Sequence, residues 1–293
     1  MKILLKKISK IIEKYWLIKL IAFWILFLMP QKILYYFQHN ITRRSLKPIL
    51  SIDNDWDYTL NKIKNYKDKE KIRLLEFGAG RNLGQNIFLS LSCKNLYQTV
   101  VDLNQMINPR LCFDAYREIS SILGQNTEIE TNNIEDFLTE LRINYISPVD
   151  VAKYQPQVKF DICVSKDTIE HIPLKDIDPI IKNIKNLLIN DGLLISCVDY
   201  SDHYAHIDKN LSNLNFLRYS SIAWFFFNPP NHYQNRIRHI DYINILLNNS
   251  FITSDVNLLK ELNLDIKPAK CYNKYEKSDL LVLRSQISSI SKV

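Results

Sequence analysis

The sequence predicts an α/β fold in which helices cover both faces of a mostly parallel sheet, the doubly wound arrangement. Short apolar segments, typical of buried parallel strands, alternate with helical patterns along the chain. These strand-like segments lie at 72–77, 98–102, 160–165 and 193–199. Three of the chain's five glycines, Gly78, Gly80 and Gly84, directly follow the first of them. Apolar residues make up 46% of the chain and charged residues 24%, which indicates a globular protein and excludes a disordered one.

The first strand, its glycine turn and a helix over 85–92 form the arrangement that receives a nucleotide or a nucleotide analogue. A dinucleotide fingerprint, G-x-G-x-x-G, would require glycine at position 83, where Leu83 stands instead. Glu76 lies two residues before the first glycine. An acidic residue there suits a cofactor that has a cationic amino group and no pyrophosphate.

The second strand ends on Asp102, at the position where a carboxylate can accept hydrogen bonds from both hydroxyls of a ribose. The alternative is an aspartate that caps a helix or a turn. Further along, a helix is predicted over 177–189, and Asp191-Gly192 is expected to turn into the strand that begins at 193. Residues 240–247 predict a helix, and 251–258 and 280–287 predict two final strands.

Four motifs in this order resemble those of class I S-adenosylmethionine (SAM)-dependent methyltransferases of the broad type 11 kind. They are Glu76-Phe77-Gly78-Ala79-Gly80, then Asp102, then Phe160-Asp161 with Ser165 and Glu170-His171-Ile172-Pro173, then Leu187-Leu188 with Asp191-Gly192-Leu193-Leu194. The match covers roughly residues 70–200. It departs from the family pattern at Asn82, where many members have a third glycine, and at Ile189-Asn190, where Lys-Pro is common. The resemblance implies a Rossmann-like, seven-stranded sheet whose last strand is antiparallel.

The resemblance also implies which residues bind SAM. Glu76 would bind the methionine amino group, above a turn formed by Gly78, Ala79 and Gly80. Asp102 would hold the ribose, and Asp150 would lie near the adenine. Lys166 and Asp167 would line the pocket beside the sulfonium, with Glu170 and His171 just beyond.

The acceptor side is expected in a polar, aromatic insertion at about 199–240. His203 directly follows the strand that borders the site, so it is the first candidate for a general base, and His171 is the second. The residues expected to bind substrate are Tyr204, His206, Arg236 and Arg238, of which the two arginines suit a phosphate or carboxylate. The histidine pair 203 and 206 lacks a clear third partner in the sequence, so no metal is predicted. The alternatives are histidines that bridge a loop and arginines on a solvated face.

Residues 1–50 predict a helical extension that precedes a methyltransferase domain over 51–293. Lysines interleave with apolar residues in its first part, and a run from Tyr15 to Met29 is apolar except for Lys19 and stops at Pro30. A helix lying in the membrane surface fits this pattern best. Packing on the domain or on a second subunit, and a true membrane span, are the alternatives. The Trp224–Phe227 run is interpreted as a lid, a membrane-facing patch beside this helix, or core.

Charge and cysteine content bear on partners and compartment. The net charge of +7 favours anionic partners, and the five scattered cysteines, without a C-x-x-C pair, predict reduced thiols in a cytoplasmic protein. Nucleic acid is disfavoured as a partner because no recognition module is present and Asn228-Pro229-Pro230 is misplaced for a base-methylation motif. The sequence makes no prediction about oligomeric state.

The predicted function is SAM-dependent O-methylation of a sugar or lipid-linked glycan intermediate at the cytoplasmic face of the membrane. Segments 200–208, 215–219 and 233–238 resemble those of methyltransferases found beside bacterial surface-polysaccharide biosynthesis genes. Two alternatives remain. One is methylation of a small isoprenoid or quinone-like molecule, and the other is a protein that binds SAM without catalysis.

Overall fold

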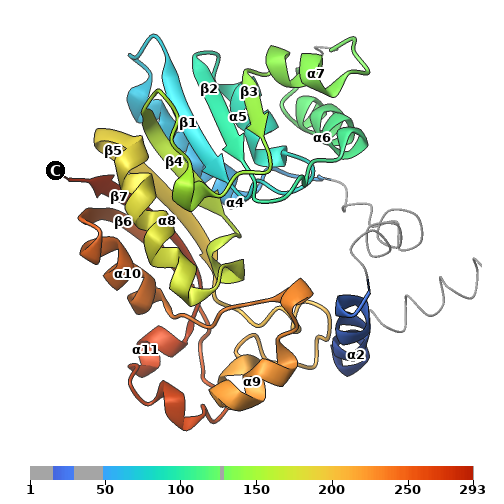
Figure 1. Cartoon of the computed structure of the whole chain (residues 1–293), viewed down its shortest axis with the longest axis vertical. Helices are drawn as coiled ribbons and strands as arrows, with labels where there is room; N and C mark the ends of the chain where they lie inside the picture. The colour runs from blue at the N-terminus through green and yellow to red at the C-terminus, as the bar shows by residue number, and fades with distance from the viewer. Residues whose placement is uncertain (1–15, 30–48, 126–128, 293) are drawn as a thin grey trace, which may run out of the picture.

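A computed structural model describes residues 16–29, 49–125 and 129–292. These residues form a single seven-stranded sheet with helices on both faces (Figure 1), which confirms the predicted fold class. The strand order is β3-β2-β1-β4-β5-β7-β6, and only β7 runs antiparallel to its neighbours. The strands are β1 Ile72–Phe77, β2 Leu96–Val101, β3 Ile143–Ile146, β4 Phe160–Lys166, β5 Leu188–Asp199, β6 Phe251–Lys260 and β7 Val282–Ser291.

Helices lie on each side of this sheet and bury its two faces. The helices are α2 Trp16–Phe27, α4 Asn54–Ile63, α5 Gly84–Ser92, α6 Pro109–Ile122, α7 Ile134–Glu140, α8 Leu174–Leu187, α9 Ser221–Phe227, α10 His239–Asn248 and α11 Lys277–Leu280. One core cluster joins the sheet to α4, α5 and α6, and another joins it to α8 and α10. Neighbouring residues of β1 point into different clusters, because side chains alternate along a strand: Leu74 into the first and Leu75 into the second.

Two parts of the fold differ from the sequence-based expectation. Residues 103–158 contain α6, α7 and the edge strand β3, none of which was predicted. In addition, β5 already begins at Leu188, so Asp191 and Gly192 form an irregularity inside the strand and not a turn before it. Asp191 has a φ of +57°, and a Cβ at Gly192 would lie 2.8 Å from the carbonyl oxygen of Ile189. The chain therefore bends here while it stays paired with β4.

Helix α2 packs against the insertion that follows β5. Its Trp16 ring lies 5.6 Å from Tyr204, and Phe23 stacks on His232 at 4.4 Å between ring centroids. Trp24 Nε1 donates a hydrogen bond to the carbonyl oxygen of Phe226, at 2.9 Å. Trp16, Phe23, Trp24 and Tyr204 belong to a third apolar cluster, which also includes residues of α9, of the segment between β5 and α10 and of the segment between β6 and β7. One face of α2 is thus packed on the chain itself.

A membrane span was one of the alternatives to the predicted surface helix, and the described residues contain no helix that could form one. Within residues 16–29, 49–125 and 129–292, no helix has the length and apolar content needed to cross a bilayer. Residues 1–15, which carry most of the predicted basic stretch, and Pro30 lie outside the described residues.

Gly84 marks a close approach of α5 to α4. A Cβ at this position would lie 2.8 Å from the Trp56 ring, which packs on Phe88 of α5. We expect Gly84→Ala to lower the free energy of unfolding by about 1–2 kcal/mol through overpacking. In a Trp56→Leu background, where the obstructing ring is absent, the same substitution should cost less than about 0.5 kcal/mol. Denaturant unfolding of the four proteins of this cycle measures both values, and an equal cost in both backgrounds would contradict the steric account.

Candidate functional site

The glycine turn lies at the carboxyl end of β1, against the loop that follows β4. Gly78 and Gly80 have φ values of +76° and +77°, a region that favours glycine. A Cβ at Gly78 would lie 2.4 Å from the hydroxyl oxygen of Thr168. That hydroxyl donates a hydrogen bond to the Gly78 carbonyl oxygen at 3.1 Å. The turn is therefore shaped by its own backbone and by a neighbour that the sequence did not single out.

Asp102 lies beside this turn, directly after β2. Its side chain is only slightly exposed, at 4% for the residue, and its Oδ2 atom has no hydrogen-bond partner. Burial raises the pKa of Asp102, whereas hydrogen bonds from Tyr145 and from the backbone of Gly78 and Ala79 lower it. A buried carboxylate oxygen without a partner is unusual and requires an explanation, such as a missing ligand.

Glu76 is buried between β1 and α5. Its carboxylate accepts hydrogen bonds from Gln85 Nε2 at 3.1 Å and from Asn86 Nδ2 at 2.8 Å. Burial raises the pKa of Glu76 to about 7, against the lowering effect of these two amides. Two amide side chains therefore hold the carboxylate close to the point where β1 enters the glycine turn.

Asp150 follows β3, and the residue before it is hydrogen-bonded to the backbone of Asp102. The Val149 N–H donates to the Asp102 carbonyl oxygen at 2.8 Å, and the Asp150 carboxylate accepts from the Ala152 N–H at 3.0 Å. The carboxylate also lies 3.3 Å from Lys153. It caps the short 3₁₀ helix Val151–Lys153, so a local structural role is present at this position.

Lys166 and Asp167 belong to a network of charged side chains at the carboxyl end of β4. Lys166 Nζ lies 2.5 Å from Asp167 and 3.3 Å from Asp53, and Arg284 of β7 pairs with both Asp167, at 2.6 Å, and Asp55. The neighbouring cations lower the pKa of Asp167 despite its burial. The network borders a cavity of about 510 Å³. Sequence reasoning missed Asp55 and Arg284, because they are 229 residues apart and meet only in the folded sheet.

The predicted histidines gather at the carboxyl ends of β4 and β5. The rings of His171 and His203 lie 5.0 Å apart, and those of His203 and His206 lie 5.3 Å apart and stack. Asp199 Oδ2 lies 3.7 Å from Nε2 of both His203 and His206. Burial lowers the pKa of His203 to about 4, while Asp199 opposes this effect. His203 is therefore a neutral imidazole at physiological pH, and one of its ring nitrogens can accept a proton.

The other three substrate-binding candidates have well-defined structural contacts. Tyr204 is buried in the α2 cluster and donates its hydroxyl to the Phe227 carbonyl oxygen at 3.0 Å. Arg238 is completely buried, and its guanidinium donates to backbone carbonyls, including that of Tyr200 at 3.0 Å. Arg236 donates to two carbonyls as well, but it also lines a cavity of about 610 Å³. Of the two arginines, only Arg236 therefore borders an open space.

The chain is similar to several solved methyltransferase structures at low sequence identity. No protein-family model matches the chain, and no curated protein matches it. Among solved structures, magnesium protoporphyrin IX methyltransferase from Synechocystis with bound S-adenosylhomocysteine (SAH) is 12% identical, with a TM-score of 0.49 over 89% of this chain and 98% of that chain. A 1,6-didemethyltoxoflavin-N1-methyltransferase from Burkholderia thailandensis is 11% identical, with a TM-score of 0.48 over 90% of this chain and 87% of that chain. A SAM-dependent methyltransferase from Methanosarcina mazei is 13% identical, with a TM-score of 0.46 over 79% and 97% of the two chains.

Sequence identities this low say nothing about what this chain binds.

The raised pKa of Glu76 makes stability depend on pH. Between pH 4.5 and pH 7 the unfolded chain releases this proton while the folded protein retains it, so stability falls as pH rises through this window. The total loss is about 3 kcal/mol. We expect Glu76→Gln to remove this pH dependence. The free energy of unfolding of the variant, relative to that of the wild type, should therefore rise by about 3 kcal/mol as the pH is raised from 4.5 to 7.

Urea unfolding across this pH range, without cofactor, measures the difference. Glu135→Gln on α7, an exposed carboxylate, is the control and should follow the wild type at every pH. A Glu76→Gln protein that stays parallel to the wild type would show that Glu76 is already ionised in the fold.

Proposed function

We propose that this chain is a SAM-dependent methyltransferase that acts on a hydroxyl of a small acceptor. The observation that carries the proposal is the buried Asp102 carboxylate, whose Oδ2 has no partner, beside the open glycine turn. A ribose has two hydroxyl donors for such a carboxylate. Gly80 supports the same reading, because a Cβ built there meets no atom within 4 Å, which leaves room for a ligand above the turn.

The cofactor side of this proposal assigns one part of SAM to each element. Asp102 holds the ribose, Glu76 attracts the methionine amino group, and the 78–80 turn passes beneath. Asp150 borders the adenine, and Lys166 with Asp167 lines the sulfonium side. SAM supplies, when bound, a methyl group on a positively charged sulfur. A buried carboxylate such as Glu76 favours a cationic partner, because ion pairing offsets the cost of its burial.

The acceptor side is proposed at the histidines. Methyl transfer needs alignment of the acceptor oxygen with the methyl carbon and, for a hydroxyl, a group that takes the proton. His203 is the first candidate, because its neutral imidazole is next to Asp199, and His171 is the second. His206 is more exposed, at 51% of its side chain, and contacts Ser201 at 3.0 Å. We propose that His206 contacts the acceptor.

A sugar or lipid-linked glycan is the acceptor class that we propose. The 610 Å³ cavity that Arg236 lines is of ligand size and combines aromatic rings with amide and charged groups. Trp224, Tyr233 and Tyr272 offer rings, and Asn228 and Arg236 offer polar groups. Tyr233, which lines the cavity, also contacts His171: its carbonyl oxygen lies 2.9 Å from His171 Nδ1. A small isoprenoid or quinone-like acceptor would contact the rings and fewer of the polar groups.

Loss of the Asp102 charge tests the cofactor assignment. We expect Asp102→Asn to weaken SAH binding about 10- to 100-fold, since hydrogen bonds to a charged group contribute about 1.5–3 kcal/mol. Isothermal titration calorimetry measures the affinity, and Asp136→Asn, an exposed aspartate on α7, should bind like the wild type. Absence of SAH binding by the wild type would defeat the enzyme proposal altogether. Transfer of labelled methyl groups into glycan, lipid or RNA fractions then identifies the acceptor.

We also propose that the protein works at the cytoplasmic surface of a membrane, held by residues 1–50 beside a methyltransferase domain over 51–293. The outer faces of α2 and α9 expose large apolar side chains side by side, joined by the Trp24–Phe226 hydrogen bond. We call this set the α2–α9 patch. Its members are at least half exposed: Leu17, Ile21, Ile25, Leu28, Ile222, Phe225 and Phe226.

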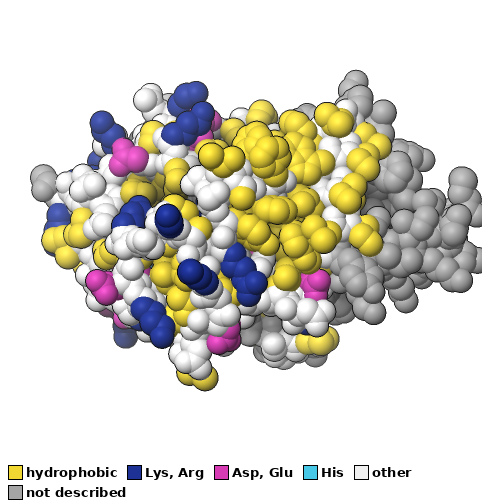
Figure 2. All heavy atoms as spheres, turned by 90° about the horizontal axis from the view of Figure 1, so that it is seen from below, with side chains coloured by type: hydrophobic (Ala, Val, Ile, Leu, Met, Phe, Trp, Pro, Cys, Tyr) yellow, Lys and Arg dark blue, Asp and Glu magenta, His cyan; other side chains and the backbone are white. Residues whose placement is uncertain are grey.

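The α2–α9 patch lies at one end of the molecule. Figure 2 shows hydrophobic side chains gathered over the face seen from below, where α2 and α9 lie. Lysines precede α2 in the sequence, at positions 2, 6, 7, 10 and 14, which suits a surface of anionic lipid. All five cysteines are free thiols, in keeping with a cytoplasmic location. Apolar area of this kind on a charged chain favours a bilayer surface over water.

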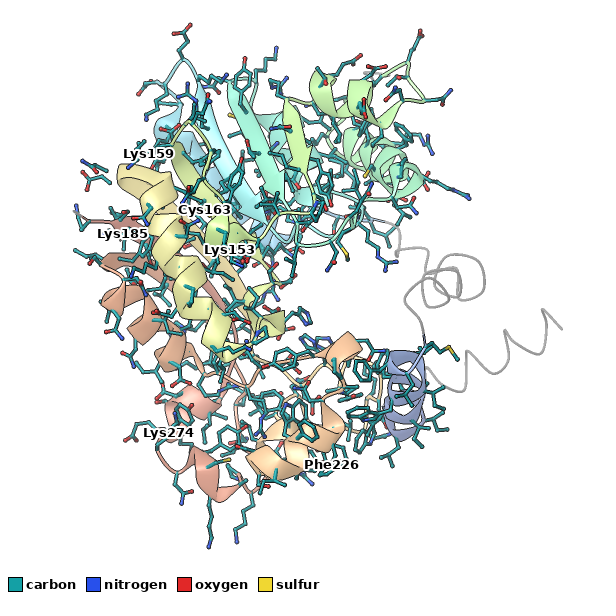
Figure 3. The ribbon with its side chains drawn as sticks, viewed as in Figure 1. Lys153, Lys159, Cys163, Lys185, Phe226 and Lys274 are labelled. Carbon is teal, nitrogen blue, oxygen red and sulfur yellow. The ribbon has the colours of Figure 1, made fainter. Side chains whose placement is uncertain are left out.

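Charged substitutions in the patch test membrane attachment. We expect Ile21→Glu with Phe226→Glu to weaken binding to vesicles of equal parts phosphatidylglycerol and phosphatidylcholine about 100-fold. The reason is that two apolar side chains, worth together about 3 kcal/mol, no longer enter the lipid. The matched control is Val158→Glu with Ile252→Glu, two exposed apolar residues on the opposite edge of the sheet. Figure 3 shows how far Lys159, the neighbour of Val158, lies from Phe226. Equal sedimentation of both double variants with vesicles would contradict the attachment.

A further inference from the structure

The carboxylate of Glu170 is buried without any hydrogen-bond partner. The residue is 2% exposed, and both Oε1 and Oε2 lack a partner. Glu170 lies in the short 3₁₀ helix Ile169–His171 that follows β4, and its backbone is fixed by the Asn235 N–H, which donates to the Glu170 carbonyl oxygen at 2.7 Å. A side chain in this state is stabilised by a cation.

His171, the next residue, belongs to the same cluster of possible metal ligands. Its Nδ1 lies 2.9 Å from the carbonyl oxygen of Tyr233. A carbonyl oxygen only accepts, so Nδ1 carries the proton and Nε2 is left with its lone pair. A backbone carbonyl that holds one ring nitrogen is the usual second contact of a metal-binding histidine, because it fixes both the tautomer and the ring orientation.

His203 completes a set of three donors. One ligand atom each of Glu170, His171 and His203 lies within 4.8 Å of the others. Asp199 Oδ2 lies 3.7 Å from the Nε2 atom of His203. Metal–nitrogen and metal–oxygen bonds of about 2.1 Å need donors about 3.4 Å apart, so modest rotations of these side chains bring them into range. Sequence reasoning considered His203 with His206 and found no third partner; the fold supplies Glu170 and His171.

We propose that Glu170, His171 and His203 form a site for one divalent transition-metal cation. Two imidazoles and one carboxylate match the preferences of Zn²⁺, Mn²⁺ and Fe²⁺, whereas Mg²⁺ and Ca²⁺ prefer oxygen donors alone. The three protein ligands leave at least one coordination position open. The role of this metal site in catalysis rests on the proposed function. The acceptor would be a hydroxyl compound whose oxygen binds the metal at the open coordination position.

The site is adjacent to the proposed cofactor. Glu170 and His171 continue the loop whose Thr168 touches the Gly78 turn, and His203 follows the end of β5. A cation there lowers the pKa of a bound hydroxyl, so that the oxygen reacts as an alkoxide. The oxygen then forms a bond to the methyl carbon while the carbon–sulfur bond breaks and its electron pair stays on sulfur. The hydroxyl proton passes to His206, which faces solvent beside Asp199. In this scheme His203 binds the metal and is not the group that accepts the hydroxyl proton.

Metal binding tests the inference without relying on activity. The full chain, stripped with a chelator, is dialysed against Zn²⁺ or Co²⁺, the bound metal is measured by mass spectrometry, and Co²⁺ binding is followed by its visible absorption. We expect one metal per chain for the wild type and for Glu135→Gln, the exposed carboxylate control. Glu170→Gln, which preserves shape and removes charge, and His203→Gln should each bind at least 10-fold more weakly. Mg²⁺ in the same dialysis should not compete.

A parallel SAH titration separates the two proposals. SAH binding without metal binding overturns the metal site and leaves His203 as the base of the proposed function. Equal metal content in Glu170→Gln and the wild type also overturns it. Loss of SAH binding in the wild type defeats the methyltransferase proposal instead. If Glu170→Gln fails to fold, which its circular dichroism spectrum would reveal, the folded His203→Gln protein decides: unchanged metal binding contradicts the site, and a loss of at least 10-fold supports it.

Discussion

The contact between Gly78 and Thr168 is the constraint on which the rest of the site depends. It joins the end of β1 to the loop after β4 so closely that no Cβ fits at position 78. The two central strands are parallel neighbours, and their carboxyl ends therefore meet at the same edge of the sheet. The side chains that the site uses here, from Lys166 at the end of β4 to His171, lie within four residues of Thr168 along the chain. A residue larger than glycine would push the loop away from the turn.

Three buried carboxylates lie around this junction, and each is stabilised in a different way. Glu76 accepts hydrogen bonds from two side-chain amides, and Asp102 is held by Tyr145 and by backbone of the glycine turn. Glu170 has no hydrogen-bond partner for either oxygen. Desolvation raises the pKa of all three. This edge of the sheet is therefore an environment that favours cations, whether ammonium, sulfonium or metal.

The central strands were predictable because burial on both faces demands a nearly continuous apolar run, which is visible without alignment. The prediction failed where this signal is absent. β3 is four residues long and includes Asn144, so it resembles a loop in sequence. The proposed cofactor-side residues Glu76, Asp102 and Lys166–Asp167 could be named because they lie at the ends of predicted strands. Asp150 follows β3, which was not predicted. Arg236 and Arg238 could not be separated from the sequence, because only tertiary contacts show that Arg238 holds backbone carbonyls in the interior.

The two faces of α2 would connect the proposed membrane surface to the histidines. Its inner face stacks Phe23 on His232, whose ring lies 6.2 Å from that of His203, while its outer face belongs to the α2–α9 patch. On the proposed membrane the histidines are thus held at a fixed height above the lipid. An acceptor with a lipid tail would diffuse to them in two dimensions and need not leave the bilayer. Turnover would then follow the number of acceptors per unit of membrane area, and inert lipid would slow the enzyme by surface dilution.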